Sequence, residues 1–256
     1  MITFCVITCT YNAVRELSRT IDSVERQTYA NVVHIIMDGL SDDGTADMAR
    51  QYARRCGDAG SHHVVTVVSE RDGGLYDAMN KAIGIASGDY VLFLNAGDTF
   101  ADDNTLERVA AMIGVGEGKE LPAVVYGNTD IVDAQGRFLH RRRLQPPERL
   151  TWRSFRMGML VCHQAFYART DMVKRILYDR RYRFSADVDW CIRIMREAER
   201  QGLGLFYTHI TLCKYLDGGL TVKNHRASLI ERFRIMVRHY GLFTTLAAHV
   251  WFVIRK

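Results

Sequence analysis

The chain has 256 residues, of which 48% are hydrophobic and 25% are charged, and it contains only 3 prolines. These proportions are typical of an ordered globular protein and exclude intrinsic disorder, collagen and low-complexity sequence. Lys and Arg total 34 against 29 Asp and Glu, and the net charge of +5 is too small to predict nucleic-acid binding. The 6 cysteines include no CxxC pair, which indicates reduced core thiols rather than a zinc site or a disulfide framework.

The sequence predicts neither a secretory signal nor a membrane span. Met1–Thr8 is too short an apolar start for a signal peptide. The longest late apolar stretch, Leu242–Ile254, falls well short of the roughly 20 residues that cross a bilayer. We therefore expect a cytoplasmic protein. Its basic excess lies at the end of the chain, because residues 223–256 contain seven Lys or Arg and one Glu.

Short apolar runs alternate with helical patterns in the first part of the chain. Strands are expected at Ile2–Ile7, Val32–Met37, Val64–Val68 and Tyr90–Leu94, and helices at Arg15–Arg26, Thr45–Cys56 and Leu75–Ala86. The strands are almost continuously apolar, as are strands that are covered on both faces of a parallel sheet. This alternation predicts an α/β fold with an open, mostly parallel twisted sheet flanked by helices.

The second half is less regular. Strands are expected at Ala123–Asn128 and Gln164–Ala168, a basic edge strand or hairpin at Gly136–Leu144, and a helix at Asp187–Gln201. From Ala227 onward the pattern predicts a C-terminal extension of two basic amphipathic helices that meet near Gly241. No linker rich in Pro, Gly or Ser divides the chain, so we expect one domain over residues 1–222 and a helical tail over 223–256.

Polar residues, many of them acidic, follow each of the first four expected strands. They occupy the segments Thr8–Asn12, Asp38–Thr45, Glu70–Gly74 and Asn95–Asp98. In open α/β sheets ligands bind beyond the carboxyl ends of the strands, where these segments meet. Carboxylates gathered on one rim repel each other unless a cation or a hydrogen-bonding group lies among them. The pattern therefore favours a divalent metal together with a polyol or a nucleotide.

Five segments also carry a resemblance to a known family: ITCTYNA at 7–13, MDGLSDDGT at 37–45, SERDGGLYDAMNKA at 69–82, LNAGD at 94–98 and FSADVDW at 184–190. In this order and spacing they resemble the inverting glycosyltransferases of family 2, which have the GT-A fold and use nucleotide-diphosphate sugars. The LNAGD form is similar to the branch that builds bacterial exopolysaccharide, colanic acid and capsule. The resemblance implies a nucleotide-binding half at 1–100 and an acceptor half at 101–222.

The resemblance implies the residues that bind the nucleotide sugar. Asp38 would accept hydrogen bonds from the base or the ribose, Tyr11 and Asn12 would line the base pocket, and Thr8 is also assigned to nucleotide-sugar binding. For Asp38 the alternative is a cap for the helix that follows Gly44. For Tyr11 the alternative is ordinary packing at the rim.

Two further loops are implied on the donor side. Asp72 precedes two glycines that let the backbone approach a diphosphate, although a turn formed with Gly73 is the alternative. Asn95 would bond a ribose hydroxyl, and Asp98 would hold Mg²⁺ or Mn²⁺. Many family members carry further aspartates in this loop, where this chain has Asn95 and Gly97, so a single carboxylate remains for the metal.

Asp187 is the implied catalytic base. Transfer with inversion needs a carboxylate that takes the proton of the acceptor hydroxyl as its oxygen attacks the anomeric carbon. Asp187 lies in the first turn of an expected helix, whose dipole favours an ionised carboxylate. The alternative is that the carboxylate only complements the positive end of the helix dipole, a role that Asp189 fits better than Asp187. The family usually has an acidic residue before the base, and this chain has Ala186.

The acceptor side carries weaker signals. The resemblance assigns it His163, Gln164 and Trp190, together with the pair Gly218-Gly219. A lone histidine beside a strand is more often a core residue, and paired glycines most often form a turn. The run Arg141–Arg143 is expected either as a solvated face or as a contact for acceptor phosphates.

The leading hypothesis is an inverting glycosyltransferase that moves a sugar to a saccharide acceptor, carried on a polyprenyl diphosphate, in bacterial surface polysaccharide synthesis. The tail would then lie on the cytoplasmic face of the inner membrane, although a helical cap on the core or a dimer contact are alternatives. A sugar nucleotidyltransferase needs a glycine-rich loop after the first strand, and Thr8–Arg15 contains no glycine. A non-catalytic, membrane-associated assembly protein is the third hypothesis.

Overall fold

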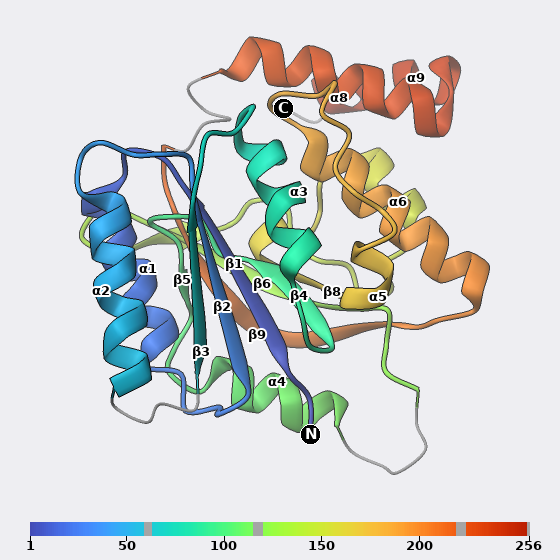
Figure 1. Cartoon of the computed structure of the whole chain (residues 1–256). Helices are drawn as coiled ribbons and strands as arrows, with labels where there is room; N and C mark the ends of the chain where they lie inside the picture. Colours follow the sequence, from blue (N-terminus) through green and yellow to red (C-terminus); the bar gives the residue numbers. More distant parts are fainter. Residues whose placement is uncertain (59–62, 115–119, 219–223, 255–256) are drawn as a thin grey trace.

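The computed structural model describes residues 1–58, 63–114, 120–218 and 224–254, and nine strands of this part of the chain form one sheet. The strands are β1 (Phe4–Thr10), β2 (Val32–Asp38), β3 (Val64–Ser69), β4 (Tyr90–Phe93), β5 (Thr99–Phe100), β6 (Val124–Val132), β7 (Phe138–Arg141), β8 (Phe166–Arg169) and β9 (Leu205–Leu216). Their order is β3-β2-β1-β4-β8-β6-β9-β5, and β7 pairs with β6 alone. Figure 1 shows the sheet between two layers of helices.

The described helices connect and flank these strands. They are α1 (Val14–Glu25), α2 (Thr45–Asp58), α3 (Leu75–Ile85), α4 (Thr105–Ile113), α5 (Thr170–Val173), α6 (Ala186–Gln201), α8 (His225–Tyr240) and α9 (Leu242–Ile254), with two 3₁₀ helices, η1 (Trp152–Met157) and η2 (His163–Ala165). Helices α1 and α2 lie on one side of the sheet, and α3 and α6 lie on the other (Figure 1).

Both faces of the central strands are buried, as their continuous apolar sequence predicts. In β2, Ile35 and Met37 belong to the large core cluster. Ile36, between them, packs in a second cluster with Leu17 of α1 and Tyr52 of α2. Successive side chains of a strand point to opposite faces, so this alternation requires a helix layer on each side.

The sheet is parallel in its first half and mixed beyond it. Strand β1 pairs in parallel with β2 and β4, and β2 pairs in parallel with β3. Beyond β4, strand β8 pairs antiparallel with both β4 and β6, β7 pairs antiparallel with β6, and β5 pairs antiparallel with β9. Among these described strands, only β6 and β9 form a parallel pair. The expectation of a mostly parallel sheet therefore holds for the nucleotide-side strands, whose carboxyl ends share one rim.

Two expectations about strands were wrong or incomplete. The strand expected at Val64–Val68 is confirmed as β3, but β3 lies at the edge of the sheet and Val64 is 60% exposed, so burial on both faces was wrong for this strand. Strands β5 and β9 and helix α4 were not predicted at all. The basic hairpin was confirmed, since β7 pairs antiparallel with β6 and all of its residues are exposed.

The C-terminal extension consists of two helices, as expected. Helix α8 ends at Tyr240 and is followed by Gly241, whose φ of +81° is readily adopted only by glycine. Among the described residues, no helix is long and apolar enough to pass through a bilayer. The expected boundary at 222/223, Gly219 of the glycine pair and the basic residues Lys223, Arg255 and Lys256 lie outside the described residues. The six cysteines form no disulfide with one another, and five of them are buried.

Candidate functional site

The loops that follow β1 and β2 are joined by hydrogen bonds at the rim. The Asn12 amide donates to Ser41 Oγ at 2.9 Å, and the Asp42 amide donates to Asn12 Oδ1 at 3.1 Å. Asn12 and Leu40 adopt φ values of +46° and +66°, a left-handed conformation that is uncommon outside glycine. Two loops held in uncommon conformations by mutual contacts are typical of a binding site.

Asp38 ends β2 as a completely buried carboxylate. It accepts hydrogen bonds from the Ser41 amide at 3.0 Å and from the hydroxyls of Ser41 and Ser69 at 2.5 and 2.6 Å. The alternative role as a cap for α2 falls to other residues, because Asp43 accepts from the amide and hydroxyl of Thr45. Asp38 thus shapes the turn after β2, and its contact with a nucleotide stays a prediction.

Tyr11, Gly39 and Asp72 meet at the rim although they are far apart in the sequence. A Cβ atom built on Gly39 would lie 2.8 Å from Asp72 Oδ2 and 3.2 Å from Tyr11 Cδ2. Asp72 also forms the expected turn, since the Gly74 amide donates to its Oδ1 at 2.7 Å. The Tyr11 residue is 65% exposed, so this junction opens to solvent.

The ends of β1 and β4 carry two polar atoms without a partner. Thr10 Oγ1 and Asn95 Oδ1 are buried and accept or donate no hydrogen bond within the described residues. A ligand hydroxyl or amide would satisfy such groups. Thr8, in contrast, is completely buried, donates to the Leu94 carbonyl at 2.7 Å and lies 3.0 Å from His34 Nε2. It therefore supports the rim from beneath.

Asp98 is a buried carboxylate that ties three segments together. Its Oδ2 accepts from Gln164 Nε2 at 2.8 Å and its Oδ1 accepts from the Leu216 amide at 2.9 Å. Burial raises the pKa of Asp98 to about 7 in spite of these two hydrogen bonds. Within the ranges that the structure describes, no group of three or more His, Cys, Asp or Glu side chains could together hold a metal ion.

Asp187 and Asp189, two residues apart in α6, lie in different surroundings. Asp187 is partly exposed, and Tyr76 Oη donates to its Oδ1 at 3.1 Å. Asp189 is completely buried, forms an ion pair with Arg193 at 2.6 Å and is hydrogen-bonded to His239 at 2.7 Å. Asp189 therefore has a structural role. Asp187 is free of such ion pairs among the described residues, and its role as the catalytic base stays a prediction.

The charges of Asp98 and Asp187 both affect the pKa of Tyr215. Burial raises the pKa of the Tyr215 phenol, and the carboxylates of Asp98 and Asp187 raise it further. A tyrosine of the unpredicted strand β9 thus lies within electrostatic range of both predicted functional carboxylates.

The three residues assigned to the acceptor side are all buried. Trp190 is completely buried and donates to the Ile176 carbonyl at 2.7 Å. His163 is 5% exposed, bonds Tyr178 Oη at 2.6 Å, and burial lowers its pKa to about 4, so it is neutral. Gln164 is also buried and bound to Asp98. Their burial fits support of the core, the ordinary alternative for a histidine beside a strand, and a contact with the acceptor stays a prediction.

Sequence reasoning missed residues that the fold brings to the rim. Arg180 Nη2 would lie 3.0 Å from a Cβ on Gly73, and Arg180 pairs with Asp77 at 3.1 Å. Tyr76 bonds Asp187, as described above. Tyr76 lies within the segment at 69–82 that carries the family resemblance, so the sequence could have indicated it as a site residue. No local pattern indicates Arg180.

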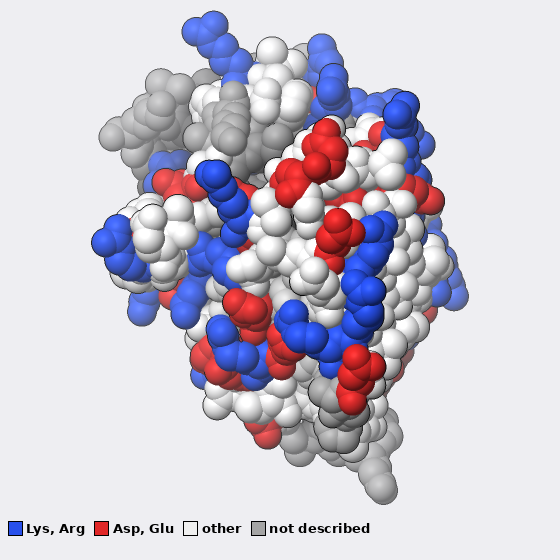
Figure 2. Space-filling model, turned by 60° about the vertical axis from the view of Figure 1, so that its left-hand side comes forward, with Lys and Arg blue, Asp and Glu red and all other residues white. Residues whose placement is uncertain are grey.

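The run Arg141–Arg143 is not simply a solvated face. The Arg142 guanidinium donates to the carbonyl oxygens of Leu144, Met159 and Leu160 at 2.6 to 3.2 Å, which holds the loop after β7. On the face in Figure 2, basic and acidic side chains are interspersed, without a broad patch of one sign.

Comparisons with known proteins identify the family of the chain. The family model described as Glycosyl transferase family 2 matches residues 5–177. A PGL/p-HBAD biosynthesis glycosyltransferase of Mycobacterium tuberculosis is 33% identical over 220 residues, which are 85% of this chain and 78% of the relative. The amylovoran biosynthesis glycosyltransferase AmsB of Erwinia amylovora is 29% identical over 199 residues, 75% of this chain and 64% of the relative.

Solved structures share the fold. S. aureus TarS 1–349 in complex with UDP-GlcNAc superposes with a TM-score of 0.70 at 18% identity, covering 91% of this chain and 64% of that one. The mannosyltransferase PcManGT from Pyrobaculum calidifontis, in complex with GDP-Man and Mn²⁺, gives 0.64 at 17% identity, covering 96% and 74%. This chain spans 40% of the longer TarS chain. Because the family match extends over more than half of the chain, the chain belongs to glycosyltransferase family 2, has the GT-A fold and is a glycosyltransferase.

Proposed function

We propose that this glycosyltransferase moves a sugar from a nucleotide-diphosphate donor to a hydroxyl of a saccharide acceptor with inversion at the anomeric carbon. The observation that carries the proposal is the partly exposed Asp187 carboxylate, held by Tyr76, beside a rim where Tyr11, Gly39 and Asp72 converge. The neighbours with bound UDP-GlcNAc and GDP-Man support a donor of this class.

The nucleotide would bind across the rim. Tyr11 offers an exposed ring for the base, with Asn12 and Asp38 holding the loops that surround it. The unpartnered Asn95 Oδ1 would accept a hydrogen bond from a ribose hydroxyl. The diphosphate would approach the Gly73-Gly74 backbone, where the Arg180 guanidinium supplies positive charge.

A divalent ion, Mg²⁺ or Mn²⁺, would contact Asp98. Such ions commonly use one or two carboxylates and take their other ligands from phosphate and water, so a single aspartate suffices. Each oxygen of Asp98 accepts one hydrogen bond and keeps a second lone pair. Burial raises the pKa of Asp98 to about 7 although the Arg19 guanidinium lowers it, so a bound cation would add to a compensation that is only partial. When bound, the ion would stabilise negative charge on the departing diphosphate.

Asp187 would supply the base. As the acceptor oxygen forms its bond to the anomeric carbon, the bond from that carbon to the diphosphate oxygen breaks, and the hydroxyl proton passes to Asp187. The electron pair of the broken bond leaves with the nucleoside diphosphate. Attack from the face opposite the leaving group inverts the anomeric centre. Asp187 lies in the first turn of α6, at the helix end that carries partial positive charge.

The proposed acceptor is a growing saccharide on a polyprenyl diphosphate. The similarity to an amylovoran biosynthesis glycosyltransferase supports a role in polysaccharide synthesis. The C-terminal helices support a place at the cytoplasmic face of the membrane. Helix α9 exposes Phe243 at 86%, with Leu242, Leu246 and Val250 exposed beside it. Arg226 and Arg234 are exposed on α8, and each basic residue near an anionic leaflet contributes about 1 kcal/mol. Figure 1 shows α9 at the end of the molecule where the loops after β1, β2 and β3 lie.

The test is a thermal-shift screen of uridine, guanosine and thymidine diphosphate sugars with and without Mn²⁺, followed by an assay of nucleoside diphosphate release with the donor that binds. We expect one donor to raise the melting temperature and to be turned over, with a product of inverted configuration by NMR. Binding without turnover in the presence of saccharide acceptors would favour a non-catalytic assembly protein. Release of inorganic diphosphate from a nucleoside triphosphate and a sugar phosphate would instead identify a nucleotidyltransferase.

A further inference from the structure

Helix α8 reaches back to the loop that precedes α6. The Glu231 carboxylate accepts hydrogen bonds from three consecutive backbone amides, with Oε1 bound to Arg183 at 2.8 Å and Oε2 bound to Phe184 at 2.8 Å and Ser185 at 3.0 Å. Hydrogen bonds to an ionised acceptor are stronger than those between neutral groups. One side chain of the C-terminal extension therefore fixes the backbone that leads into α6.

The side chain of Ser185 makes a second bond to α8. Ser185 stands at the N-terminal cap of α6, yet its hydroxyl makes no capping bond within that helix. It donates to the Ser228 carbonyl at 3.3 Å and lies 2.9 Å from Ser228 Oγ, and both serines are buried. A serine at this position usually bonds its own helix, so its contact with α8 is a departure that couples the two helices.

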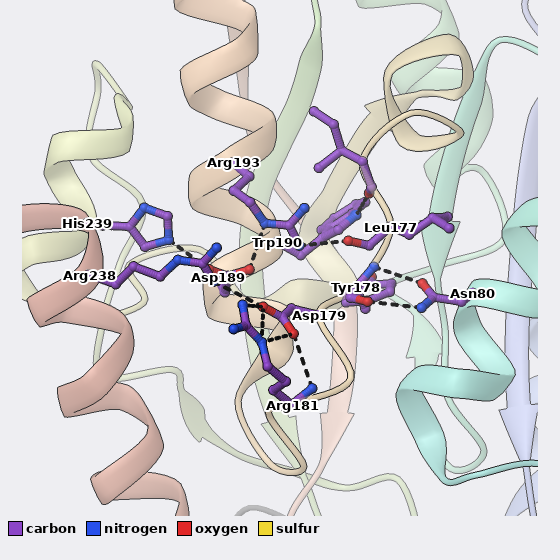
Figure 3. Close-up of polar contacts among 11 residues, drawn as sticks. Asn80, Leu177, Tyr178, Asp179, Arg181, Asp189, Trp190, Arg193, Arg238 and His239 are labelled. Carbon is purple, nitrogen blue, oxygen red and sulfur yellow. Dashed lines mark hydrogen bonds and ion pairs between the residues drawn. The ribbon is translucent and has the colours of Figure 1, made fainter.

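A third contact lies just beyond Asp187, and Figure 3 shows it in close-up. His239 of α8 bonds Asp189 at 2.7 Å, and the adjacent Arg238 pairs with Asp179 at 3.0 Å. Burial opposes the charge of Asp189, but His239 and Arg193 hold the pKa of Asp189 below its ordinary value. Asp187 thus lies between two segments that α8 holds, residues 183–185 before it and Asp189 after it.

We propose that Glu231 is a positioning residue for Asp187, an inference that rests on the proposed role of Asp187 as the base. By binding the three amides, Glu231 fixes the first turn of α6 and so the direction of the Asp187 carboxylate. Glu231 also raises the pKa of Tyr76, after burial and Asp187, which places its charge near the pair that it would orient. Helix α8 is on this view a part of the catalytic machinery and more than a basic tail.

The test compares Glu231→Gln with Glu199→Gln in the full chain. The amide nitrogen of the introduced glutamine side chain cannot accept a hydrogen bond, so at least one of the three backbone amides loses its partner. We expect kcat to fall about 10²-fold, as when a catalytic group is displaced by about 1 Å, with the donor KM changed less than about twofold. Glu199 is the matched control, since it joins the far end of α6 to Trp152 and Arg153 with two bonds of 2.7 Å. Its substitution should leave kcat unchanged.

The same substitution in an Asp187→Asn background separates positioning from general loss of structure. If Glu231 acts through Asp187, Glu231→Gln produces no further loss in that background, whereas a loss of folded protein reduces both backgrounds equally. An equal loss in both backgrounds, or a wild-type kcat for Glu231→Gln, overturns the inference. Full activity of Asp187→Asn alone refutes instead the proposed function. Should Glu231→Gln fail to fold, Ser228→Ala carries the test: a several-fold lower kcat at unchanged donor KM supports the inference, and wild-type kcat overturns it.

Discussion

The hydroxyl of Tyr76 donates a hydrogen bond of 3.1 Å to Oδ1 of Asp187, 111 residues further along the chain. This bond joins the start of α3, on the donor side, to the start of α6, which carries the proposed base. Burial and the nearby Asp187 carboxylate raise the pKa of Tyr76 well above its ordinary value, so the phenol stays protonated and remains a donor. The Tyr76 ring packs against Tyr178, with centroids 5.4 Å apart.

Substitution of Tyr76 by phenylalanine should therefore lower kcat and leave the fold intact. The ring contact with Tyr178 is kept, and only the bond to Asp187 is lost. We expect a fall in kcat of about 10-fold, the equivalent of one hydrogen bond of about 1.4 kcal/mol. Initial rates at saturating donor, with thermal unfolding recorded in parallel, measure this. An unaltered kcat would show that the Tyr76 hydroxyl does not orient the base.

Substitution of Gly39 by alanine should weaken donor binding. The added methyl would lie 2.8 Å from Asp72 Oδ2 and 3.2 Å from Tyr11, so the carboxylate or the ring must move. We expect the dissociation constant of the donor to rise at least about 10-fold, which corresponds to a loss of about 1.4 kcal/mol of binding free energy. Titration calorimetry with the donor measures the change.

Gly84→Ala is the matched control for that substitution. Gly84 lies within α3, and a Cβ there meets nothing within 4 Å. Because glycine is less favourable than alanine in a helix by about 0.8–1.0 kcal/mol, Gly84→Ala should raise the melting temperature and leave donor affinity unchanged. Equal donor affinity in both variants would contradict a nucleotide site at the junction of Tyr11, Gly39 and Asp72.

Stability should depend on pH through Asp98. Burial raises its pKa from 3.8 to about 7 in the folded chain, so the folded state binds a proton more readily than the unfolded state. The destabilising effect of the ionised carboxylate is fully present above pH 7 and is lost as the pH falls toward 4. Relative to Asp98→Asn, the wild type should therefore gain melting temperature between pH 8.5 and pH 5.5 in a chelating buffer.

The same group makes metal binding depend on pH. A metal ligand must be deprotonated, so protons compete with Mn²⁺ for Asp98 below its pKa of about 7. Mn²⁺ with nucleoside diphosphate should raise the melting temperature of the wild type more at pH 8 than at pH 6, and should have a smaller effect on Asp98→Asn at pH 8. An equal response of both proteins would mean that Asp98 does not contact the ion.

The exposed apolar side chains of α9 predict binding to anionic vesicles. Phe243 and Leu246 are 86% and 45% exposed, and a fully buried side chain of this size contributes about 1.5–3 kcal/mol. Phe243→Glu with Leu246→Glu should reduce co-sedimentation with anionic vesicles at least about 10-fold. Met112→Glu, which alters a 39% exposed residue on α4, is the control and should bind as the wild type does. Binding that survives the double substitution would indicate that α9 packs against protein instead.

Continuous apolar runs identified the central strands because both faces of β1, β2 and β4 are covered by helices. The same reasoning failed at β3, since a run of five apolar or β-branched residues looks identical at the edge of a sheet, where Val64 is exposed. Strand β9 was missed because its burial is irregular and its sequence mixes His209 and Lys214 with apolar residues. Its position beside β6 depends on pairing across the chain, which no local pattern records.

The candidate site, like the fold, was predictable only in part. The rim loops were predictable because glycines and carboxylates follow strands that share one end of a sheet. Glu231 was not predictable, because it binds backbone amides 46 to 48 residues away and backbone amides carry no residue identity. Nor did the sequence distinguish side chains that line the rim from those that support it, and Thr8, His163 and Trp190 all lie in the core.

Asp187→Asn tests the proposed chemistry most directly. The substitution keeps the shape of the side chain and removes its ability to take a proton, so nucleoside diphosphate release and donor binding should respond differently. We expect kcat to fall by about 10²- to 10⁴-fold, the usual contribution of a general base, with the donor dissociation constant within about threefold of the wild type. A kcat within twofold of the wild type would contradict the assignment of Asp187 as the base.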